Sequence, residues 1–379
     1  MRRRDVLALL GGAALAWPGR GRAAQAALEE TVGFAGQKLF LETKPPALVI
    51  GAVRNGQGFV SGFGRRAERT LRPPDGDTMF RIGSVTKAFT GQVLASLAAD
   101  GIVSLGDRLT KYAPEFEESL SEGGRPIRLV DLATHSAGLP REAPHAAAPP
   151  GDPFATITRQ AFVAWLRSNP LLFTPGTSVL YSNFGFDLLA AALSAAARKP
   201  YPELLAERVL KPIGLADTTF APARGDFGRL MRGHDFNGAA MPYGPTGSVI
   251  VGSGGLYASP RDLLRWLAWH LDRFADERAA ERLLDHAAWL PRDGLQSVFG
   301  VDGEGRMDGM GLGWVIMAPE GDRPLILQKV GGLQGVISYV AFAPARGVGV
   351  MAAISAFDVA AARALAQTAN GLLAGLAPR

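Results

Sequence analysis

A serine and a lysine three residues apart form the first candidate catalytic pair in this chain. Ser84 and Lys87 follow a strand-like segment, 78–83, and precede an amphipathic helical pattern, 88–97. Residues at positions i and i+3 share one face of a helix, so the hydroxyl and the ammonium can meet. A neutral serine needs such a nearby base to act as a nucleophile. On its own, S-x-x-K is more often a helix cap followed by a solvated lysine, so further motifs must decide.

Two such motifs lie downstream. Tyr181-Ser182-Asn183 precedes an apolar helical pattern and supplies a phenol and an amide. A phenol can shuttle a proton when cations lie nearby, and an amide both donates and accepts hydrogen bonds. Lys329-Val330-Gly331-Gly332 stands at the end of a strand-like segment, 324–328, and another strand-like segment, 336–343, follows. Its lysine supplies positive charge, and its glycines let a strand backbone approach a ligand closely.

In this order, S-x-x-K, Y-S-N and K-x-G resemble the three motifs of the serine penicillin-recognising enzymes, which include class C β-lactamases and D-alanyl-D-alanine peptidases. The tyrosine of the second motif is similar to the class C form. Further similarity runs through 132–142, 252–257, 311–314 and 338–342, and it covers about residues 45–355. These segments look most like class C-like penicillin-binding proteins of the periplasmic D-alanyl-D-alanine carboxypeptidase/endopeptidase type.

The resemblance implies an exported serine hydrolase that acts on peptidoglycan peptides through an acyl-enzyme and binds β-lactams, with no cofactor and no metal. It implies that Ser84 attacks the carbonyl, that Lys87 and Tyr181 take its proton, and that Tyr181 returns one to the leaving amine. The backbone N–H groups of Ser84 and Gly332 would form the oxyanion hole. The implied catalytic residues are Ser84, Lys87 and Tyr181, and the implied substrate-binding residues are Asn183, Lys329, Gly331 and Gly332.

Val330 departs from the family pattern. Peptidases of the family usually carry Thr or Ser there, and that hydroxyl contacts the carboxylate of the substrate or antibiotic. The departure predicts weak recognition of a terminal carboxylate and an approximately tenfold gain on such substrates in Val330→Thr. It leaves two alternatives open: a class C-like esterase or weak β-lactamase, and a penicillin-binding sensor that is acylated without turnover.

The first 26 residues carry most of the positive charge. The chain has a formal net charge of +5, but without this segment 35 basic and 34 acidic side chains remain, which removes the electrostatic argument for nucleic-acid binding. Arg2-Arg3-Arg4 precede an apolar stretch, 6–17, and Ala24-Gln25-Ala26 offers a cleavage site. We therefore predict an export signal over residues 1–26, resembling a twin-arginine signal, and a periplasmic protein.

Hydrophobic patterns predict a sheet built from both ends of the chain around a helical middle. We expect a hairpin over 47–53 and 58–64, strands at 312–317, 324–330, 336–343 and 347–355, and helices at 27–41, 94–99, 160–167, 184–197, 202–209 and 359–373. The predicted fold class is α/β (α+β), β-lactamase/transpeptidase-like, with an antiparallel sheet flanked by helices and an inserted helical lobe. Residues 27–90 and 250–379 would form the α/β lobe, and 91–249 the mainly helical lobe.

Four other patterns receive a structural interpretation. The five histidines show no H-E-x-x-H or comparable spacing, which argues against a metal site. Gly252-Ser253-Gly254-Gly255 follows an apolar run, but Tyr257 occupies the third glycine position of a dinucleotide-binding loop. Ser259 and Asp262 fit a helix N-cap and its N3 acid. The Ala- and Pro-rich segment 142–153 is expected to be a loop that overhangs the cleft.

Overall fold

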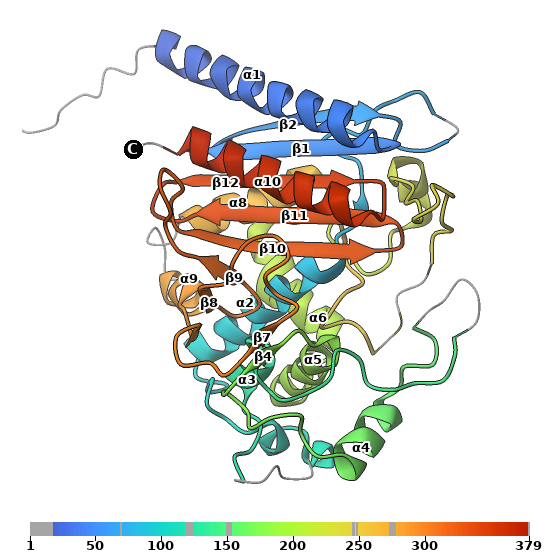
Figure 1. Ribbon diagram of the computed structural model, residues 1–379, viewed down its shortest axis with the longest axis vertical. Coiled ribbons are helices and arrows are strands. Elements are labelled where there is room, and N and C mark those ends of the chain that lie inside the picture. Colours follow the sequence, from blue (N-terminus) through green and yellow to red (C-terminus); the bar gives the residue numbers. More distant parts are fainter. Residues whose placement is uncertain are drawn as a thin grey trace, which may run out of the picture.

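An eight-stranded antiparallel sheet forms the upper half of the molecule (Figure 1). The structure, a computed structural model, describes residues 18–68, 70–117, 124–148, 154–244, 247, 249–272 and 278–377, with side chains from residue 22 onward. The strand order is β2-β1-β12-β11-β10-β9-β8-β6, so strands from both ends of the chain lie side by side. The predicted fold class, an antiparallel sheet flanked by helices, is confirmed.

The central strands are mostly apolar because both faces of the sheet are covered. In β1, Ile50 and Ala52 pack toward α1 and α10, whereas Val49 and Val53 belong to the larger core on the opposite face. Successive strand side chains point to opposite faces, so a strand buried on both faces shows no polar alternation. Helix α8 packs on this second face against β1 and β12.

The bounds of the strands agree with the hairpin and with the three long strands expected near the C-terminus. The strands are β1 (Ala47–Arg54), β2 (Gln57–Gly64), β3 (Phe80–Arg81), β4 (Val179–Leu180), β5 (Tyr257–Ala258), β6 (Leu290–Pro291), β7 (Val298–Phe299), β8 (Gly309–Met310), β9 (Val315–Met317), β10 (Ile326–Leu333), β11 (Val336–Ala343) and β12 (Val348–Ile354). The segment expected as one strand at 312–317 is instead a turn followed by β9. Gly313 in that turn has a φ of +84°, which favours glycine.

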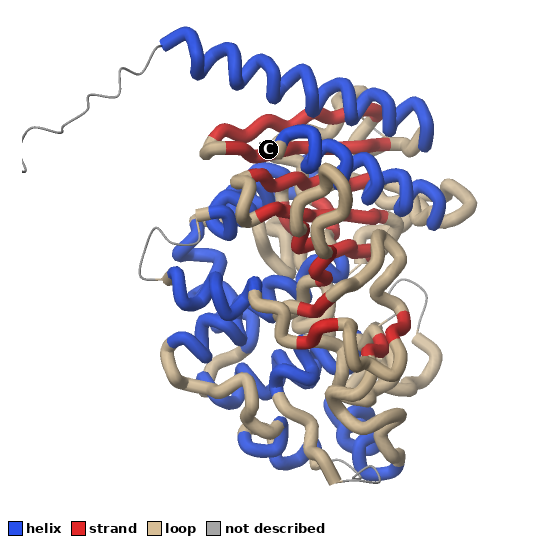
Figure 2. Tube along the Cα trace, turned by 60° about the vertical axis from the view of Figure 1, so that its left-hand side comes forward, coloured by secondary structure: helices blue, strands red, loops and turns tan. Residues whose placement is uncertain are grey.

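Helices and loops make up most of the lower half of the molecule, with a few short strands among them, as the view in Figure 2 shows. The α-helices are α1 (Pro18–Thr43), α2 (Thr86–Ala99), α3 (Leu129–Ala133), α4 (Arg159–Ser168), α5 (Asn183–Ala197), α6 (Tyr201–Leu205), α7 (Lys211–Ile213), α8 (Pro260–Leu271), α9 (Ala279–His286) and α10 (Val359–Leu376). Ser259 accepts a hydrogen bond from the N–H of Asp262, which confirms the predicted cap of α8. No helix within the described ranges combines the length and apolar character needed to span a bilayer.

Two helices differ from the expectations. Helix α2 is not amphipathic: every residue from Thr86 to Leu97 is buried, because the helix lies in the main core. Helix α1 begins at Pro18 rather than near Ala27, so the predicted cleavage site, 24–26, lies within it. The predicted leader residues 1–17 lie outside the described residues, as do residues 149–153 of the expected overhanging loop.

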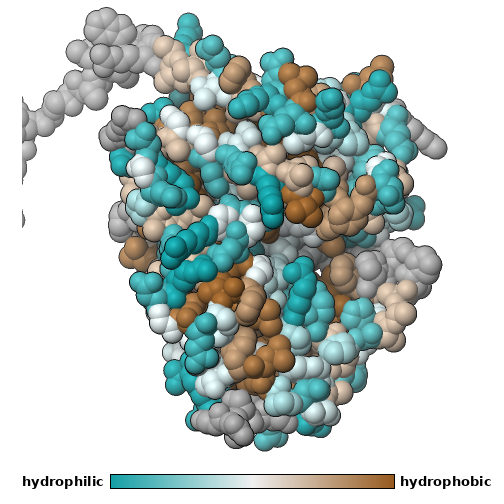
Figure 3. Space-filling model, in the orientation of Figure 1, coloured by the Kyte–Doolittle hydropathy of each residue, from teal (hydrophilic) through white to brown (hydrophobic). Residues whose placement is uncertain are grey.

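The visible face in Figure 3 mixes hydrophilic residues with apolar patches.

Candidate active site

Ser84 lies where the sheet meets the helical half. It occupies a short 3₁₀ turn, η1 (Gly83–Val85), between β3 and the start of α2. The first N–H groups of a helical segment have no partner within the segment, so they remain available to an anionic ligand. Thus the predicted position of Ser84, after a strand and before a helix, agrees with the structure.

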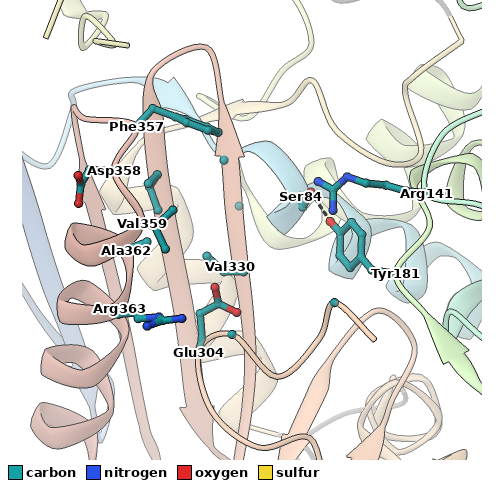
Figure 4. A pocket seen from close by; sticks show the side chains of 15 residues that line it. Ser84, Arg141, Tyr181, Glu304, Val330, Phe357, Asp358, Val359, Ala362 and Arg363 are labelled. Carbon is teal, nitrogen blue, oxygen red and sulfur yellow. Dashed lines mark hydrogen bonds between the residues drawn. The ribbon is translucent and has the colours of Figure 1, made fainter. Parts of the chain in front are cut away.

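Two side chains converge on the Ser84 hydroxyl. The Tyr181 hydroxyl donates to Ser84 Oγ at 2.6 Å (Figure 4), and Lys87 Nζ donates to the same oxygen at 3.1 Å. Tyr181 follows β4, which places it one residue before the cap of α5, whereas Lys87 is one helical turn beyond the serine. The serine therefore has two possible proton acceptors within hydrogen-bonding distance, which is the arrangement that activates a hydroxyl nucleophile.

Lys87 is held by three acceptors in the protein interior. Besides Ser84, its Nζ donates to Asn183 Oδ1 at 2.5 Å and to the backbone carbonyl of Ser253 at 2.7 Å. Burial lowers the pKa of Lys87 to about 7, although the carboxylates of Asp187 and Glu142 oppose this effect. A lysine with a pKa in this range can accept a proton near neutral pH.

Asp187 completes this arrangement behind Lys87. The N–H and hydroxyl of Ser253 donate to the two carboxylate oxygens of Asp187, at 2.9 and 3.0 Å. Burial raises the pKa of Asp187, while the nearby ammonium of Lys87 opposes that rise. The loop carrying Ser253 is thus fixed by Asp187 and presents its carbonyl to Lys87.

Three cations surround the Tyr181 ring. Lys87 Nζ, Lys329 Nζ and Arg141 Cζ lie 4.9, 5.1 and 4.9 Å from its centroid. Burial lowers the pKa of Lys329 to about 8, and Tyr181 opposes that effect. Cations so placed stabilise negative charge on a nearby oxygen.

His135 supports the tyrosine from another side. Its ring stacks on Tyr181 at a centroid distance of 4.5 Å, and its Nδ1 accepts the N–H of Ser182 at 3.0 Å. Burial and then the charges of Lys329 and Lys87 hold the pKa of His135 well below its usual range. A neutral histidine so placed orients the second motif.

The glycines of the third motif allow strand β10 to pack directly against the backbone around Ser84. A Cβ at Gly331 would lie 2.0 Å from the carbonyl oxygen of Ile82 and 2.8 Å from the nitrogen of Ser84. Gly331 and Gly332 therefore lie within β10 pressed against η1, rather than in a turn after the strand. The expected close approach is present, but its partner is the protein backbone.

Ser84 opens onto two cavities. The first, about 420 Å³, is also lined by Tyr181, Val330 and Glu304, and it reaches Arg363 on α10. The second, about 290 Å³, is lined by Ser84, Asn183, Glu142 and residues of the 250–254 loop. Because Tyr181 lines only the first cavity and Asn183 only the second, the two sides of a bound substrate would meet different residues of the second motif.

Known proteins share this arrangement of sequence and fold. The model of the family described as Beta-lactamase matches residues 26–374. The chain belongs to the β-lactamase family. It is 39% identical over 284 residues to the D-alanyl-D-alanine-carboxypeptidase/endopeptidase AmpH of Escherichia coli K12, which covers 74% of this chain and 72% of AmpH. It is 25% identical over 329 residues to a β-lactamase of Lysobacter lactamgenus, covering 81% of each.

A solved structure extends the match. The crystal structure of a β-lactamase/D-alanine carboxypeptidase from Yersinia pestis, complexed with citrate, has a TM-score of 0.83 and 34% identity and covers 94% of this chain and 99% of that one. This β-lactamase-family chain is a serine hydrolase, as the matching relatives are.

Sequence reasoning singled out the three motifs of this β-lactamase-family site but missed their supports. Asp187, Ser253 and Glu142 were given no role, although the Glu142 carboxylate accepts a hydrogen bond from Asn183 Nδ2. One signal was available: Asp187 is an acid within an otherwise apolar helix, four residues after Asn183 and hence on the same face. Both polar atoms of Asn183 face protein groups, so one lone pair and one N–H remain for a substrate amide.

A buried histidine pair lies apart from the catalytic site. His270 Nδ1 lies 2.9 Å from Nε2 of His286 and 3.6 Å from a carboxylate oxygen of Asp285, which also accepts the Trp314 indole N–H. Burial lowers the pKa of His270 and raises that of Asp285 well above its usual value. These three ligand-type groups come from two helices, so spacing along the chain could not reveal them. That the chain binds no metal stays a prediction.

Proposed function

We propose that this protein is a D-alanyl-D-alanine carboxypeptidase/endopeptidase that cleaves peptidoglycan peptides through an acyl-enzyme on Ser84. The observation that carries the proposal is the convergence of Lys87 Nζ and the Tyr181 hydroxyl on Ser84 Oγ, at 3.1 and 2.6 Å, beside a cavity large enough for a peptide end. The 39% identity to AmpH, whose name records this activity, supports the choice of substrate.

In the proposed reaction, Ser84 attacks the carbonyl of a D-alanyl bond and its proton passes to Lys87 or Tyr181. The N–H groups of Ser84 and Gly332 receive the developing oxyanion. Tyr181 then donates a proton to the leaving amine, which departs into the first cavity. Asn183 binds an amide of the acyl part in the second cavity, and water finally releases the acyl group from Ser84.

A second candidate rests on Val330. Because the family's hydroxyl is missing there, an esterase or a weak β-lactamase could use the same nucleophile without recognising a terminal carboxylate. A sensor that is acylated by penicillin and not deacylated would share the nucleophile as well. The three possibilities differ in which acyl donors react and in whether the acyl-enzyme is released.

One experiment separates them. Purified protein is incubated with nitrocefin, p-nitrophenyl acetate and a pentapeptide ending in D-Ala-D-Ala, and the products and the intact protein mass are measured. With the peptide, we expect release of D-alanine and no lasting adduct on the protein. Turnover of the ester or nitrocefin alone would favour the second candidate, and a stable nitrocefin adduct on the protein without turnover of any substrate would favour the sensor.

We also propose that the protein is exported and that its mature form begins at Ala27. Among the residues of α1 whose side chains are described, from residue 22 onward, Leu28, Val32 and Leu39 are buried, while residues 22–26 are exposed or half-buried, so cleavage after Ala26 would remove none of these packed side chains. N-terminal sequencing of the protein from its native host is expected to begin at Ala27, and the double substitution Arg3→Lys/Arg4→Lys is expected to slow export. A cytoplasmic protein that begins at Met1 would contradict this.

A further inference from the structure

The loss of a hydroxyl at position 330 raises the question of what else could bind a substrate carboxylate beside Ser84. Val330 lines the first cavity, and its side chain offers no hydrogen bond. The Lys329 ammonium is buried against the Tyr181 ring, and Lys329 is not among the residues that line either cavity. Lys87 already donates to three protein acceptors. The remaining cations of the first cavity are Arg141 and Arg363.

Distance along the substrate decides between these two arginines. In a terminal D-alanyl peptide, the carboxylate lies within about 4 Å of the scissile carbonyl carbon, since one residue spans about 3.8 Å. The group that binds it must therefore lie close to Ser84. Figure 4 shows the Arg141 guanidinium beside Ser84 and Tyr181, whereas Arg363 lies beyond Val330 on α10. Arg141 alone of the two is within reach.

Arg141 is held in place by its backbone and free at its guanidinium. Its carbonyl accepts the N–H groups of Asn183 and Phe184, at 2.8 and 3.2 Å, which fixes the residue to the start of α5. The guanidinium lies over the Tyr181 ring, and within the described ranges it forms no ion pair or hydrogen bond with the protein. A guanidinium offers five donors in a planar fork that matches a carboxylate. Among the described residues, no protein acceptor occupies this fork, and Arg141 lines both cavities that open beside Ser84.

We propose that Arg141 binds the terminal carboxylate of the leaving residue and so takes over the contact that the family's hydroxyl makes at the position of Val330. The inference rests on the proposed peptidase function and names its substrate class: peptides with a free carboxylate on the residue that leaves. Arg141 is in this view a specificity-determining residue, while Ser84, Lys87 and Tyr181 carry the chemistry.

The test compares two substrates that differ only at the terminus, an acyl-D-Ala-D-Ala acid and its C-terminal amide. The wild type is expected to prefer the acid. In Arg141→Gln the ratio of kcat/KM for acid over amide is expected to fall by about tenfold to a hundredfold, the range of a charge-assisted contact. Arg141→Lys keeps the charge but lacks the planar fork, so in this variant the ratio should fall less. Arg363→Gln, a cation removed from the far end of the same cavity, should leave the ratio unchanged.

Adding Val330→Thr sharpens the comparison. The sequence alone predicts a gain of about tenfold from Val330→Thr in the wild type; if Arg141 already holds the carboxylate, the threonine should instead raise the ratio by about tenfold in Arg141→Gln and by much less in the wild-type background. An unchanged ratio in both Arg141 variants, or a wild type with no preference for the acid, would overturn the inference. Hydrolysis of p-nitrophenyl acetate separates failure of the Arg141 inference from failure of the proposed peptidase function. An enzyme that cleaves the ester but neither peptide disproves the peptidase function itself.

Discussion

Ser84→Ala is expected to lower ester and peptide hydrolysis by at least about 10⁴-fold, because it removes the hydroxyl that we propose forms the acyl-enzyme. The loss should appear in kcat/KM for p-nitrophenyl acetate and for the pentapeptide alike, since both need the same nucleophile. A fluorescent penicillin should label the wild type, and peptide mapping should place the label on Ser84. The alanine variant should remain folded, since the substitution removes one oxygen from a residue that lies at the surface of two cavities.

The matched control is Ser104→Ala, which removes the hydroxyl of an exposed serine in the loop after α2. This variant should be labelled and should turn over ester as the wild type does. Labelling that persists in Ser84→Ala would disprove the mechanism, because another residue would then be the nucleophile.

The catalytic pair of the first motif could be predicted because its geometry is local. Ser84 and Lys87 are three residues apart at the start of a helix, and helix geometry alone brings them together. Tyr181 lies 97 positions from Ser84, and no local pattern predicts that contact. Family resemblance supplied it, since the order of the motifs implies a common fold. The positions of Asp187 and Ser253 behind Lys87 depend on packing between α5 and a loop 66 positions away, which neither spacing nor resemblance had indicated.

The fold was predictable where apolar runs were long. Strands β11 and β12 are buried on both faces and β10 is buried over 326–329, so their sequences are mostly apolar and their bounds are nearly as expected. The bounds of the short strands β8 and β9 were not predictable, because the turn between them, at 311–314, is set by contact with α2. A Cβ at Gly313 would lie 2.5 Å from the carbonyl oxygen of Lys87, a tertiary constraint that no local propensity contains. Helix α2 is buried over 86–97 for the same reason, since its burial comes from tertiary packing rather than from local propensity.

Lys87→Ala is expected to lower kcat/KM by about 10³-fold, within the range of general-base catalysis, and to remove the acidic limb of the pH profile. Lys87 must be neutral to accept the proton of Ser84. Its pKa is about 7, so wild-type activity on an uncharged ester should rise with pH and level off above about 7. At lower pH the ammonium form dominates, and activity should fall about tenfold for each further pH unit.

Asp187→Asn tests the sign of this dependence. The carboxylate of Asp187 favours the charged form of Lys87 and so raises the pKa of the lysine, while burial lowers it. Where Asp187 is ionised, which the neighbouring Lys87 ammonium favours against burial, removing its negative charge leaves the effect of burial on Lys87 less opposed, so the acidic limb should move to lower pH. The asparagine can still bind Ser253, which keeps the loop carbonyl on Lys87. Asp187→Ala loses both the charge and that contact and should in addition lower the plateau. The measurement is kcat/KM for p-nitrophenyl acetate from pH 5 to 9, and a limb in Asp187→Asn that stays in place or moves to higher pH would exclude this role.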